Sequence, residues 1–460
     1  MTGSQQLRAP GRRPTVGLCM IVRDEAAMLP GLLDSVRGVV DQLVVVDTGS
    51  VDHTRVIARA AGAVVVDHPW DGHFAEARNA ALPHVRAEWM LLLDADERLA
   101  PGAGAALHAA IADGQFDLGL LPLSNASRFD ASPAEVLSGA ARLGEVSHLP
   151  RLFRVDPTLR WEGRIHESPL SWVTGKRMAF VDAPIIHLGR VQELVREREK
   201  GKRNLSLLLQ RVGEEPDEPV TYAYLVTDLY AAGQLDQARR YEEQGWEVVT
   251  RHCADPGNRR PPRIVPLAGV RAQRQLGDRD FKGAAETLAT GRRYGGEHPN
   301  FDWIEGCLVL AQHKEGQPAD LERGVRLLQG TLASKGAVFG DTLYSGIFGV
   351  ATELPLAQLL FLHGEVGEAL QRFDRLLAAG QGGVEARLGR VDCLIAMGRL
   401  HEARAALQPL AQVLERSSTD LRDVAALRAR IDGGLGLDPG PALAAATSPG
   451  GRWLGPHRRL

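Results

Sequence analysis

The sequence predicts an α/β domain with a Rossmann-like sheet, followed by an all-α array of stacked helix pairs. Between residues 15 and 99, short apolar segments alternate with segments whose apolar residues recur at helical spacing. Strands that are apolar throughout and alternate with helices are typical of a parallel sheet that helices cover on both faces. From about residue 220 onward, helix-turn-helix segments recur at a fixed period instead. This change of pattern predicts two structural parts.

Four strands and three helices alternate in the first part. The strands are expected at Val16–Val22, Leu43–Val46, Val64–Val66 and Trp89–Leu93, and the helices at Ala26–Val36, Thr54–Ala61 and Phe74–Leu82. Prolines divide residues 100–206 into short pieces, which predicts strands and loops there. A helix over Val191–Val212 is expected to bridge the two parts.

Composition and charge narrow the classes of function. The 460 residues carry 54 Lys and Arg against 57 Asp and Glu, so no general basic field favours nucleic acid. No apolar run approaches the about 18 residues that span a bilayer. The four cysteines show no C-x-x-C spacing, which favours thiols in a reducing compartment over a disulfide framework. We therefore expect a soluble cytoplasmic protein without a transmembrane segment or a nucleic-acid partner.

Acidic side chains follow three of the predicted strands. Right-handed crossovers place the carboxyl ends of parallel strands on one edge of the sheet, where ligands bind in open α/β folds. Two carboxylates one residue apart suit a divalent cation, which would hold a pyrophosphate and neutralise its charge as it departs. The acidic rim predicted in this way comprises Arg23-Asp24-Glu25, Asp47 and Asp94-Ala95-Asp96.

Two other α/β sites fit these residues less well. A dinucleotide-binding Rossmann domain requires G-x-G-x-x-G after the first strand, and Arg23-Asp24-Glu25-Ala26-Ala27 stands there instead. A phosphatase with an aspartyl nucleophile can use a D-x-D pair, but we would expect that pair on the first strand. Here it follows the fourth strand.

The second part has the period of a tetratricopeptide (TPR) repeat. The turn glycines Gly364 and Gly398 lie 34 positions apart, and the Leu and Ala residues around them follow the same pattern. Diverged copies begin at Tyr222, Leu267 and Trp303. We expect four or five stacked repeats, which are enough to bury a continuous core. A generic array of amphipathic helices is the alternative.

These motifs together resemble the family 2 glycosyltransferases with a GT-A fold, in particular bacterial members fused to C-terminal TPR repeats. The matching stretches are Leu18–Glu25, Val44–Thr54, Ala77–Leu82 and Trp89–Glu97; Asp24 departs from the Asn that members often carry. The resemblance implies an α/β GT-A domain, the nucleotide-diphospho-sugar transferase fold, at 15–205 and a TPR-like solenoid at 206–437. A flexible N-terminus at 1–14 and a flexible tail at 438–460 would flank them.

The resemblance also assigns roles to the rim. Asp94 and Asp96 would touch the ribose of a nucleotide-diphospho-sugar and a Mg²⁺ or Mn²⁺ ion on its diphosphate. The residues expected to bind or support the nucleoside are Arg23, Asp24, Glu25, Asp47, Asp52 and Arg78. Two of them have alternative roles: Asp52 could cap the helix that begins at Thr54, and Arg78 could be an ordinary surface residue.

Two later stretches, Arg151–Arg154 and Trp161–Glu167, match the family's R-L-F-R and H-E motifs. Members invert the anomeric centre in one displacement, so a general base must take the proton of the acceptor. Glu167 is the candidate base, and His166 would ligate the metal or share that role, with His187 as a second candidate. The arginines expected to offset diphosphate charge, unless they form a salt-bridged loop, are Arg151, Arg154 and Arg164.

The leading hypothesis is an inverting, metal-assisted glycosyltransferase that moves a sugar from a nucleotide-diphospho-sugar to a hydroxyl or thiol of an unidentified acceptor. A different class remains open, in which the repeats are a protein-binding scaffold and the α/β domain is inactive. The two can coexist if the repeats deliver an acceptor or a separate protein partner. Transfer to a peptide or protein is a further alternative.

Overall fold

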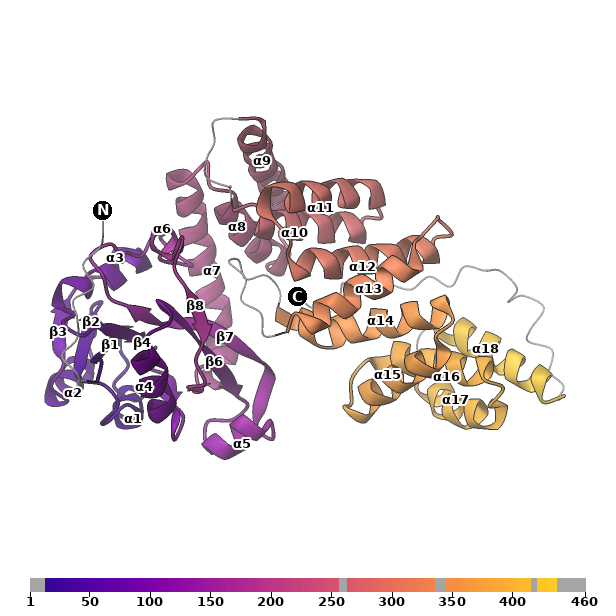
Figure 1. The fold of residues 1–460 in the computed structure, drawn as a ribbon, viewed down its shortest axis with the longest axis horizontal. Coiled ribbons are helices and arrows are strands. Elements are labelled where there is room, and N and C mark those ends of the chain that lie inside the picture. Colours follow the sequence, from indigo (N-terminus) through magenta and orange to yellow (C-terminus); the bar gives the residue numbers. More distant parts are fainter. Residues whose placement is uncertain (1–12, 256–262, 336–344, 415–419, 437–460) are drawn as a thin grey trace. The chain divides into compact units, whose positions relative to one another are not determined.

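The computed structural model describes residues 13–255, 263–335, 345–414 and 420–436 (Figure 1). It divides into two compact units, Met1–Pro216 and Asp217–Leu460. The division follows α7 (Arg190–Glu214), so the boundary expected at 205/206 lies inside this helix. The two ends expected to be flexible are residues 1–14 and 438–460. Apart from residues 13 and 14, they lie outside the described residues.

The first unit is built on one mixed sheet, whose nine described strands follow the order β3-β2-β1-β4-β7-β6-β9-β5, with β8 pairing with β6. β1 runs parallel to β2 and β4, and β2 runs parallel to β3, whereas β7 joins antiparallel to β4. The strands are β1 (Val16–Val22), β2 (Gln42–Asp47), β3 (Val64–Asp67), β4 (Trp89–Leu92), β5 (Glu97–Leu99), β6 (Leu118–Ala126), β7 (Arg142–Arg154), β8 (Met178–Phe180) and β9 (Ile185–His187).

Both faces of the parallel half are covered, because alternate residues of each strand enter different cores. Leu18 and Met20 of β1 pack into one core with side chains of α1 and α4, whereas Cys19 packs into a second core with α3. The helices of this unit are α1 (Leu29–Ser35), α2 (Thr54–Ala60), α3 (Phe74–Asn79), α4 (Ala103–Asp113), α5 (Pro133–Ser138), α6 (Leu170–Val173) and α7.

The region from residue 100 to 206 was predicted as strands and loops, but it also contains the helices α4, α5 and α6. It contains α4, whose mostly alanine sequence presents only Leu107 and Ile111 as large buried side chains and gives a weak helical pattern. It also contains β7, a 13-residue strand that is longer than the prolines suggested. Pro150 is accommodated at a register shift between β6 and β7, which fits the preference of proline for bulges.

The second unit consists of paired antiparallel helices, as the repeat period predicts. Gly364 and Gly398 follow α14 and α16 with φ of 98° and 72°, a backbone region that favours glycine. The helices are α8 (Pro219–Ala231), α9 (Leu235–Ala254), α10 (Val265–Gly277), α11 (Phe281–Gly295), α12 (Pro299–Lys314), α13 (Leu321–Ala333), α14 (Val350–His363), α15 (Val366–Ala378), α16 (Gly383–Ala396), α17 (Leu400–Leu414) and α18 (Asp420–Gly434).

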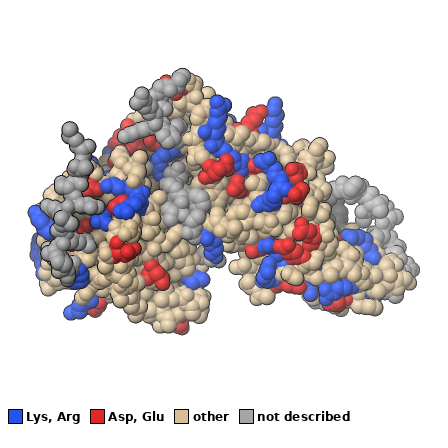
Figure 2. Space-filling model, viewed as in Figure 1, with Lys and Arg blue, Asp and Glu red and all other residues tan. Residues whose placement is uncertain are grey.

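Two observations bear on the surface and on membrane crossing. Figure 2 shows acidic and basic side chains interspersed on the visible face, which agrees with the near balance of 54 basic against 57 acidic residues. No helix among the described residues combines the length and the apolar character that a membrane crossing requires.

Candidate active site

The carboxyl ends of β1, β2 and β4 form one edge of the sheet, as predicted. Asp47 is the last residue of β2 and pairs with Val22 at the end of β1. Asp94 and Asp96 lie in the turn that follows β4, which pairs with β1 on its other side. The three parallel strands therefore bring residues from far apart in the sequence to a common rim.

Asp47 has one satisfied and one unsatisfied oxygen. Its Oδ1 accepts hydrogen bonds from the backbone N–H groups of Gly49 and Ser50 at 3.1 and 3.0 Å, and it lies 2.9 Å from Nε of Arg55. Its Oδ2 is buried and has no hydrogen-bond partner among the described residues. A buried carboxylate oxygen without a partner is costly, so this atom is suited to receive a donor group from a ligand.

The loop after β1 is tied to the loop after β2. Asp24, at φ 54°, accepts the Val51 N–H on Oδ1 at 2.8 Å, and its own N–H donates to Oγ of Ser50 at 2.9 Å. The N–H of Glu25 donates to Oγ1 of Thr54 at 2.8 Å. These bonds hold Asp24 and Glu25 beside the loop that carries Asp47.

Two further residues expected at this half-site differ in how firmly they are held. Oδ2 of Asp52 accepts the Ala26 N–H at 3.0 Å and Oδ1 accepts the Thr54 N–H at 2.9 Å, so Asp52 serves both as a turn residue for α2 and as a link to the first loop. The hydrogen bond from the Thr54 hydroxyl lowers the pKa of Asp52. Arg23 is exposed, and its guanidinium has no bond to another described residue.

Asp94 shares a guanidinium with a buried glutamate. Nη2 of Arg151 lies 2.5 Å from Oε1 of Glu97 and 3.4 Å from Oδ2 of Asp94, and the Asp94 N–H donates to Oε2 of Glu97 at 2.9 Å. Burial favours a higher pKa for Asp94, but Arg151 and Arg78 outweigh it and lower that pKa. Burial raises the pKa of Glu97 to about 7 against the opposing effect of Arg151.

Asp96 faces a histidine from the antiparallel half of the sheet. Nε2 of His187 lies 3.4 Å from Oδ2 of Asp96, and Nδ1 of His187 lies 2.8 Å from Oδ1 of Asn125. Gly189 stands beside this pair. A Cβ at position 189 would lie 2.7 Å from Nε2 of His187 and closer still to Oδ2 of Asp96. The backbone of Gly189 therefore approaches both groups closely, and a side chain at this position would displace at least one of them.

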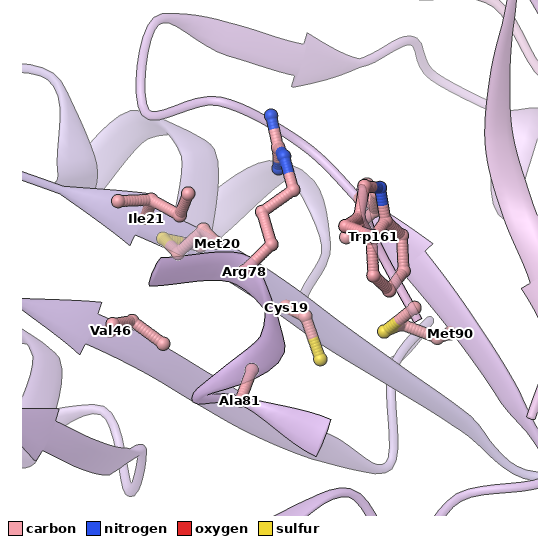
Figure 3. Close-up of a pocket in the computed structure, with 9 residues that line it drawn as sticks. Cys19, Met20, Ile21, Val46, Arg78, Ala81, Met90 and Trp161 are labelled. Carbon is pink, nitrogen blue, oxygen red and sulfur yellow. The ribbon is translucent and has the colours of Figure 1, made fainter. Parts of the chain in front are cut away.

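Arg78 connects the D-x-D turn to the candidate base. Its Nε donates to Oε1 of Glu167 at 2.6 Å, and its Nη2 lies 3.9 Å from Oδ1 of Asp94. The side chains of Arg78 and Glu167 are only 15% and 11% exposed, so Arg78 is not an ordinary surface residue. Figure 3 shows Arg78 in a pocket that Trp161, Met90 and Cys19 also line.

The loop that carries Glu167 is fixed from α7. Arg211, which is 1% exposed, donates from Nη1 to the carbonyl oxygens of Ile165 and His166 at 2.5 and 3.4 Å. His166 has φ of 51°, which is strained for a residue other than glycine, and it is exposed. The buried cation of Arg211 therefore holds the backbone beside Glu167.

Two arginines expected at the site are directed elsewhere. Arg164 binds Glu214 and donates to the carbonyl of Gly72 at 3.0 Å. Arg154 pairs with Asp117 at 3.2 Å, at the end of β4 opposite to the D-x-D turn. His166 is exposed as described above, whereas His187 is the histidine beside Asp96. Among the described residues, no group of three or more His, Cys, Asp or Glu side chains is arranged to hold a metal alone.

Several residues of the site had no role in the sequence prediction. Glu97 was visible as part of the Asp94–Glu97 stretch, and its position next to a D-x-D pair at a strand start was the only signal. Asn125 gave no signal, because its proximity to His187 depends on the pairing of β6 with β9. Gly189 gave none because it approaches Asp96 only through the pairing of β5 with β9. Arg55, which neutralises Asp47, could have been suspected from its place in the first turn of α2.

Comparison with known proteins gives matches in both parts of the chain. Residues 18–136 match the model of glycosyl transferase family 2, and residues 360–431 match a tetratricopeptide repeat model. A TPR repeat-containing protein of Synechococcus elongatus is 33% identical over 244 residues, which cover 50% of this chain and 56% of that protein. An uncharacterized glycosyltransferase of Rickettsia bellii is 38% identical over 80 residues, 17% of this chain and 27% of its own.

A further relative is the SPbeta prophage-derived glycosyltransferase SunS of Bacillus subtilis, at 22% identity over 234 residues, 50% of this chain and 52% of that protein. The match thus spans about half or less of the length of these relatives. Among solved structures, glucosyl-3-phosphoglycerate synthase of Mycobacterium tuberculosis with Mn²⁺, UDP and glucosyl-3-phosphoglycerate aligns at 23% identity and a TM-score of 0.22. That alignment covers 26% of this chain and 50% of the other.

The two family matches confirm the resemblance drawn from the sequence motifs. Together with the mixed sheet and the paired helices, they confirm the expected fold class, a GT-A α/β domain followed by a TPR-like solenoid. The chain therefore joins a region similar to glycosyl transferase family 2, at residues 18–136, to a region similar to a tetratricopeptide repeat, at residues 360–431.

Proposed function

We propose that the protein transfers a sugar from a nucleotide-diphospho-sugar to an unidentified acceptor, with inversion at the anomeric carbon. The observation that carries this proposal is the common rim of the three parallel strands. It places the unpartnered Oδ2 of Asp47 on the same edge as Asp94 and Asp96. A buried acceptor atom for a nucleoside and a pair of carboxylates for a diphosphate-bound cation are the two parts that a nucleotide-sugar site requires.

The donor nucleoside would bind between the loops after β1 and β2. Oδ2 of Asp47 would accept a hydrogen bond from the base or the ribose, while Arg55 and the turn amides hold Oδ1 in place. Asp24 and Glu25 would form the adjoining wall, and Asp52 would act through the backbone of that loop. Arg23 is available for the donor because it has no bond to another described residue.

The residues beside the D-x-D turn fit a divalent cation. Asp96 and His187 present a carboxylate oxygen and an imidazole nitrogen 3.4 Å apart; carboxylates suit Mg²⁺ and Mn²⁺, and histidine is a common metal ligand. Two protein ligands suffice for an ion that is also bound by substrate phosphates. When bound, such an ion would neutralise the charge that develops on the departing diphosphate. Asp94 and Arg151 would flank it.

Glu167 is the proposed general base. The acceptor hydroxyl would lose its proton to Glu167 as its oxygen bonds to the anomeric carbon, and the bond from that carbon to the diphosphate oxygen would break. Arg78 orients Glu167 and reaches Asp94, so the base and the donor site are linked through one guanidinium. His166 remains a weaker candidate than Glu167 because its side chain is exposed.

The repeats would bind either the acceptor or a separate protein, since stacked helix pairs present extended surfaces for protein ligands. A peptide or protein acceptor would combine both functions. The placement of the protein in the cytoplasm rests on its cysteines, which are free thiols in the described residues.

A donor panel tests the proposal. The full chain is incubated with UDP-, GDP- and TDP-sugars and Mn²⁺, and binding is followed by thermal shift, since a ligand of the folded state raises its melting temperature. Slow hydrolysis of the bound donor is measured in parallel. We expect donors of one nucleotide class to bind. We expect the Asp96→Ala variant to lose the Mn²⁺-dependent part of donor binding and of donor hydrolysis. Binding of no donor, or hydrolysis that is unaffected by Asp96→Ala, would contradict the proposal.

A further inference from the structure

We infer that Arg211, near the end of α7, is a positioning residue that sets the direction in which Glu167 leaves its loop. The inference rests on the proposed function in so far as that function makes Glu167 the general base. Arg211 binds the main chain of the loop, so its effect on the base passes through the backbone. The boundary expected at 205/206 would assign Arg211 to the repeats, whereas the structure places it in the first unit, together with the loop.

The loop that carries the proposed base is closed at its two ends. Glu162 and Ser168 form an antiparallel bridge, in which each N–H donates to the carbonyl of the other residue, at 3.0 and 3.1 Å. Asn79 of α3 fixes the residue before this bridge, since its Oδ1 accepts the N–H of Trp161 at 2.8 Å and its Nδ2 donates to the Trp161 carbonyl at 3.0 Å. The path of residues 163–167 therefore decides where the base points.

Two residues on this path have left-handed backbone angles. Gly163 has φ of 93° and His166 has φ of 51°. Glycine adopts such an angle freely, but a residue with a Cβ keeps it only where its surroundings hold it there. His166 immediately precedes Glu167, so its backbone angles set the direction of the side chain that follows. A group that holds His166 in this conformation consequently holds the base.

Arg211 is such a group. Its Nη1 donates to the carbonyl of Ile165 at 2.5 Å and to the carbonyl of His166 at 3.4 Å. These carbonyls belong to the two peptide groups on either side of the His166 Cα, so one guanidinium nitrogen contacts both peptide planes. Hydrogen bonds from a charged donor are stronger than bonds between neutral groups. The guanidinium is oriented in turn from α7, because its Nε donates to Oε2 of Glu215 at 2.8 Å.

The guanidinium also packs directly against the loop. A Cβ at Gly163 would lie 2.5 Å from Cζ of Arg211 and 2.6 and 2.7 Å from its two terminal nitrogens. Arg211 is 1% exposed, so removing its guanidinium would take the donor away from the Ile165 carbonyl inside the protein. A lysine ammonium would keep the charge there but lacks the planar, rigid arrangement of donors.

A second contact between the end of α7 and the loop is more exposed. Glu214 binds Arg164, and the carbonyl of Arg164 accepts the N–H of Phe74 at 2.8 Å. The side chain of Glu214 is 45% exposed, and ion pairs at the surface contribute little to stability. We therefore expect Arg211, rather than Glu214, to determine the position of the base.

Variants of the full chain test the inference. The measured quantity is kcat for hydrolysis of the donor that the panel identifies, with Mn²⁺ present and water as the acceptor that loses its proton to Glu167. A displacement of about 1 Å from the reactive geometry can cost about 100-fold in rate. We expect Arg211→Met to lower kcat by about that factor and to keep the donor-induced shift in melting temperature. Arg211→Lys, which can still reach one carbonyl, should recover part of the loss, and Glu214→Gln is the control that should retain kcat.

A double variant distinguishes positioning from a general effect on the fold. In the Glu167→Gln background the base is already lost, so we expect Arg211→Met to lower kcat no further. Losses that multiply in the double variant, or a normal kcat in Arg211→Met, overturn the inference. If circular dichroism shows that Arg211→Met does not fold, Gly163→Ala takes its place, because its Cβ meets the same guanidinium from the side of the loop. It should show the same loss and the same lack of additivity.

Hydrogen exchange measures the loop without a donor. We expect the backbone amides of residues 163–168 to exchange faster in Arg211→Met than in the wild type and in Glu214→Gln. Unchanged exchange in Arg211→Met overturns the inference even if no donor is found. A normal kcat in Glu167→Gln contradicts the choice of base, and with it the inference. Binding of no donor contradicts the proposed function alone, and the exchange of the loop then decides whether Arg211 shapes it.

Discussion

Arg78 and Glu167 lie 89 positions apart in the sequence, and Nε of the arginine donates to Oε1 of the glutamate at 2.6 Å. The same guanidinium lies 3.9 Å from Oδ1 of Asp94. A single side chain on α3 therefore joins the loop that carries the proposed base to the turn that carries the D-x-D pair. The pair also limits how Glu167 can be tested, because a variant must keep Arg78 in place.

Glu167→Gln meets this requirement, since an amide oxygen can still accept the hydrogen bond from Arg78 but the amide cannot take a proton at neutral pH. We expect kcat to fall by about 10²- to 10⁴-fold, the usual effect of losing a general base, while the affinity for the donor changes little. Steady-state kinetics with the identified donor measures both. Glu162→Gln in the same loop is the control, and a Glu167→Gln variant with normal kcat would show that the base lies elsewhere.

Asp47→Asn tests the donor site. The side chain is 1% exposed, and the substitution removes the charge from Oδ2, which has no hydrogen-bond partner in the part of the chain that the structure describes. A hydrogen bond to a charged group contributes about 1.5–3 kcal/mol, so we expect binding of the matching nucleotide to weaken by about 10- to 100-fold. Isothermal titration with UDP, GDP or TDP measures this affinity. The exposed Asp34→Asn should bind normally, and equal affinity of the Asp47 variant would remove Asp47 from the site.

The strand ends could be predicted because the physics that forms them is local. β1, β2 and β4 are buried on both faces, so their apolar runs stand out, and the acidic residues that end them mark the rim. The parallel crossovers then require Asp47 and Asp94 to share an edge. The D-x-D rim therefore follows from sequence alone.

The antiparallel half could not be predicted in the same way. Its strands are partly exposed, and β6 and β7 change register at two places, so no sequence period fixes which side chains meet. The choice of His187 over His166 beside Asp96 depends on the pairing of β9 with β5 and β6. The direction of Arg164 depends on a loop that turns at Gly163 with φ of 93° and is bound by Arg211.

Gly189→Ala tests the placement of Asp96 and His187. Gly189 has φ of -63°, which alanine adopts freely, but the added Cβ would lie 2.7 Å from Nε2 of His187 and closer still to Oδ2 of Asp96, so at least one of these side chains must move. We expect the Mn²⁺-dependent part of donor binding to be lost. Gly213→Ala on the same helix is the matched control, because a Cβ there meets no atom within 4 Å. Normal Mn²⁺ dependence in Gly189→Ala would exclude Asp96 and His187 as the ligands of the cation.

A buried lysine makes the stability of the repeat unit depend on pH. Lys314 ends α12 and donates from Nζ to Oε1 of Gln358 at 3.0 Å. Burial lowers the pKa of Lys314 to about 8, against the opposing effects of Cys307 and Glu385. An unfolded chain keeps the lysine proton up to a pKa of about 10.4. Between these two values the unfolded state binds more protons, so the folded state gains stability as the pH rises.

Replacing Lys314 by methionine removes the free-energy cost of burying a charged ammonium group in the folded state, and it keeps a flexible apolar side chain. We expect Lys314→Met to unfold at a higher urea concentration than the wild type at pH 7, and the difference to shrink as the pH rises from about 8 to about 10.4, where the unfolded lysine also loses its proton. Far-ultraviolet circular dichroism measures the midpoints. Lys282→Met, whose side chain is 89% exposed in the wild type, should show no such trend. A difference that stays constant over this range would mean that Lys314 keeps its ordinary pKa in the folded chain.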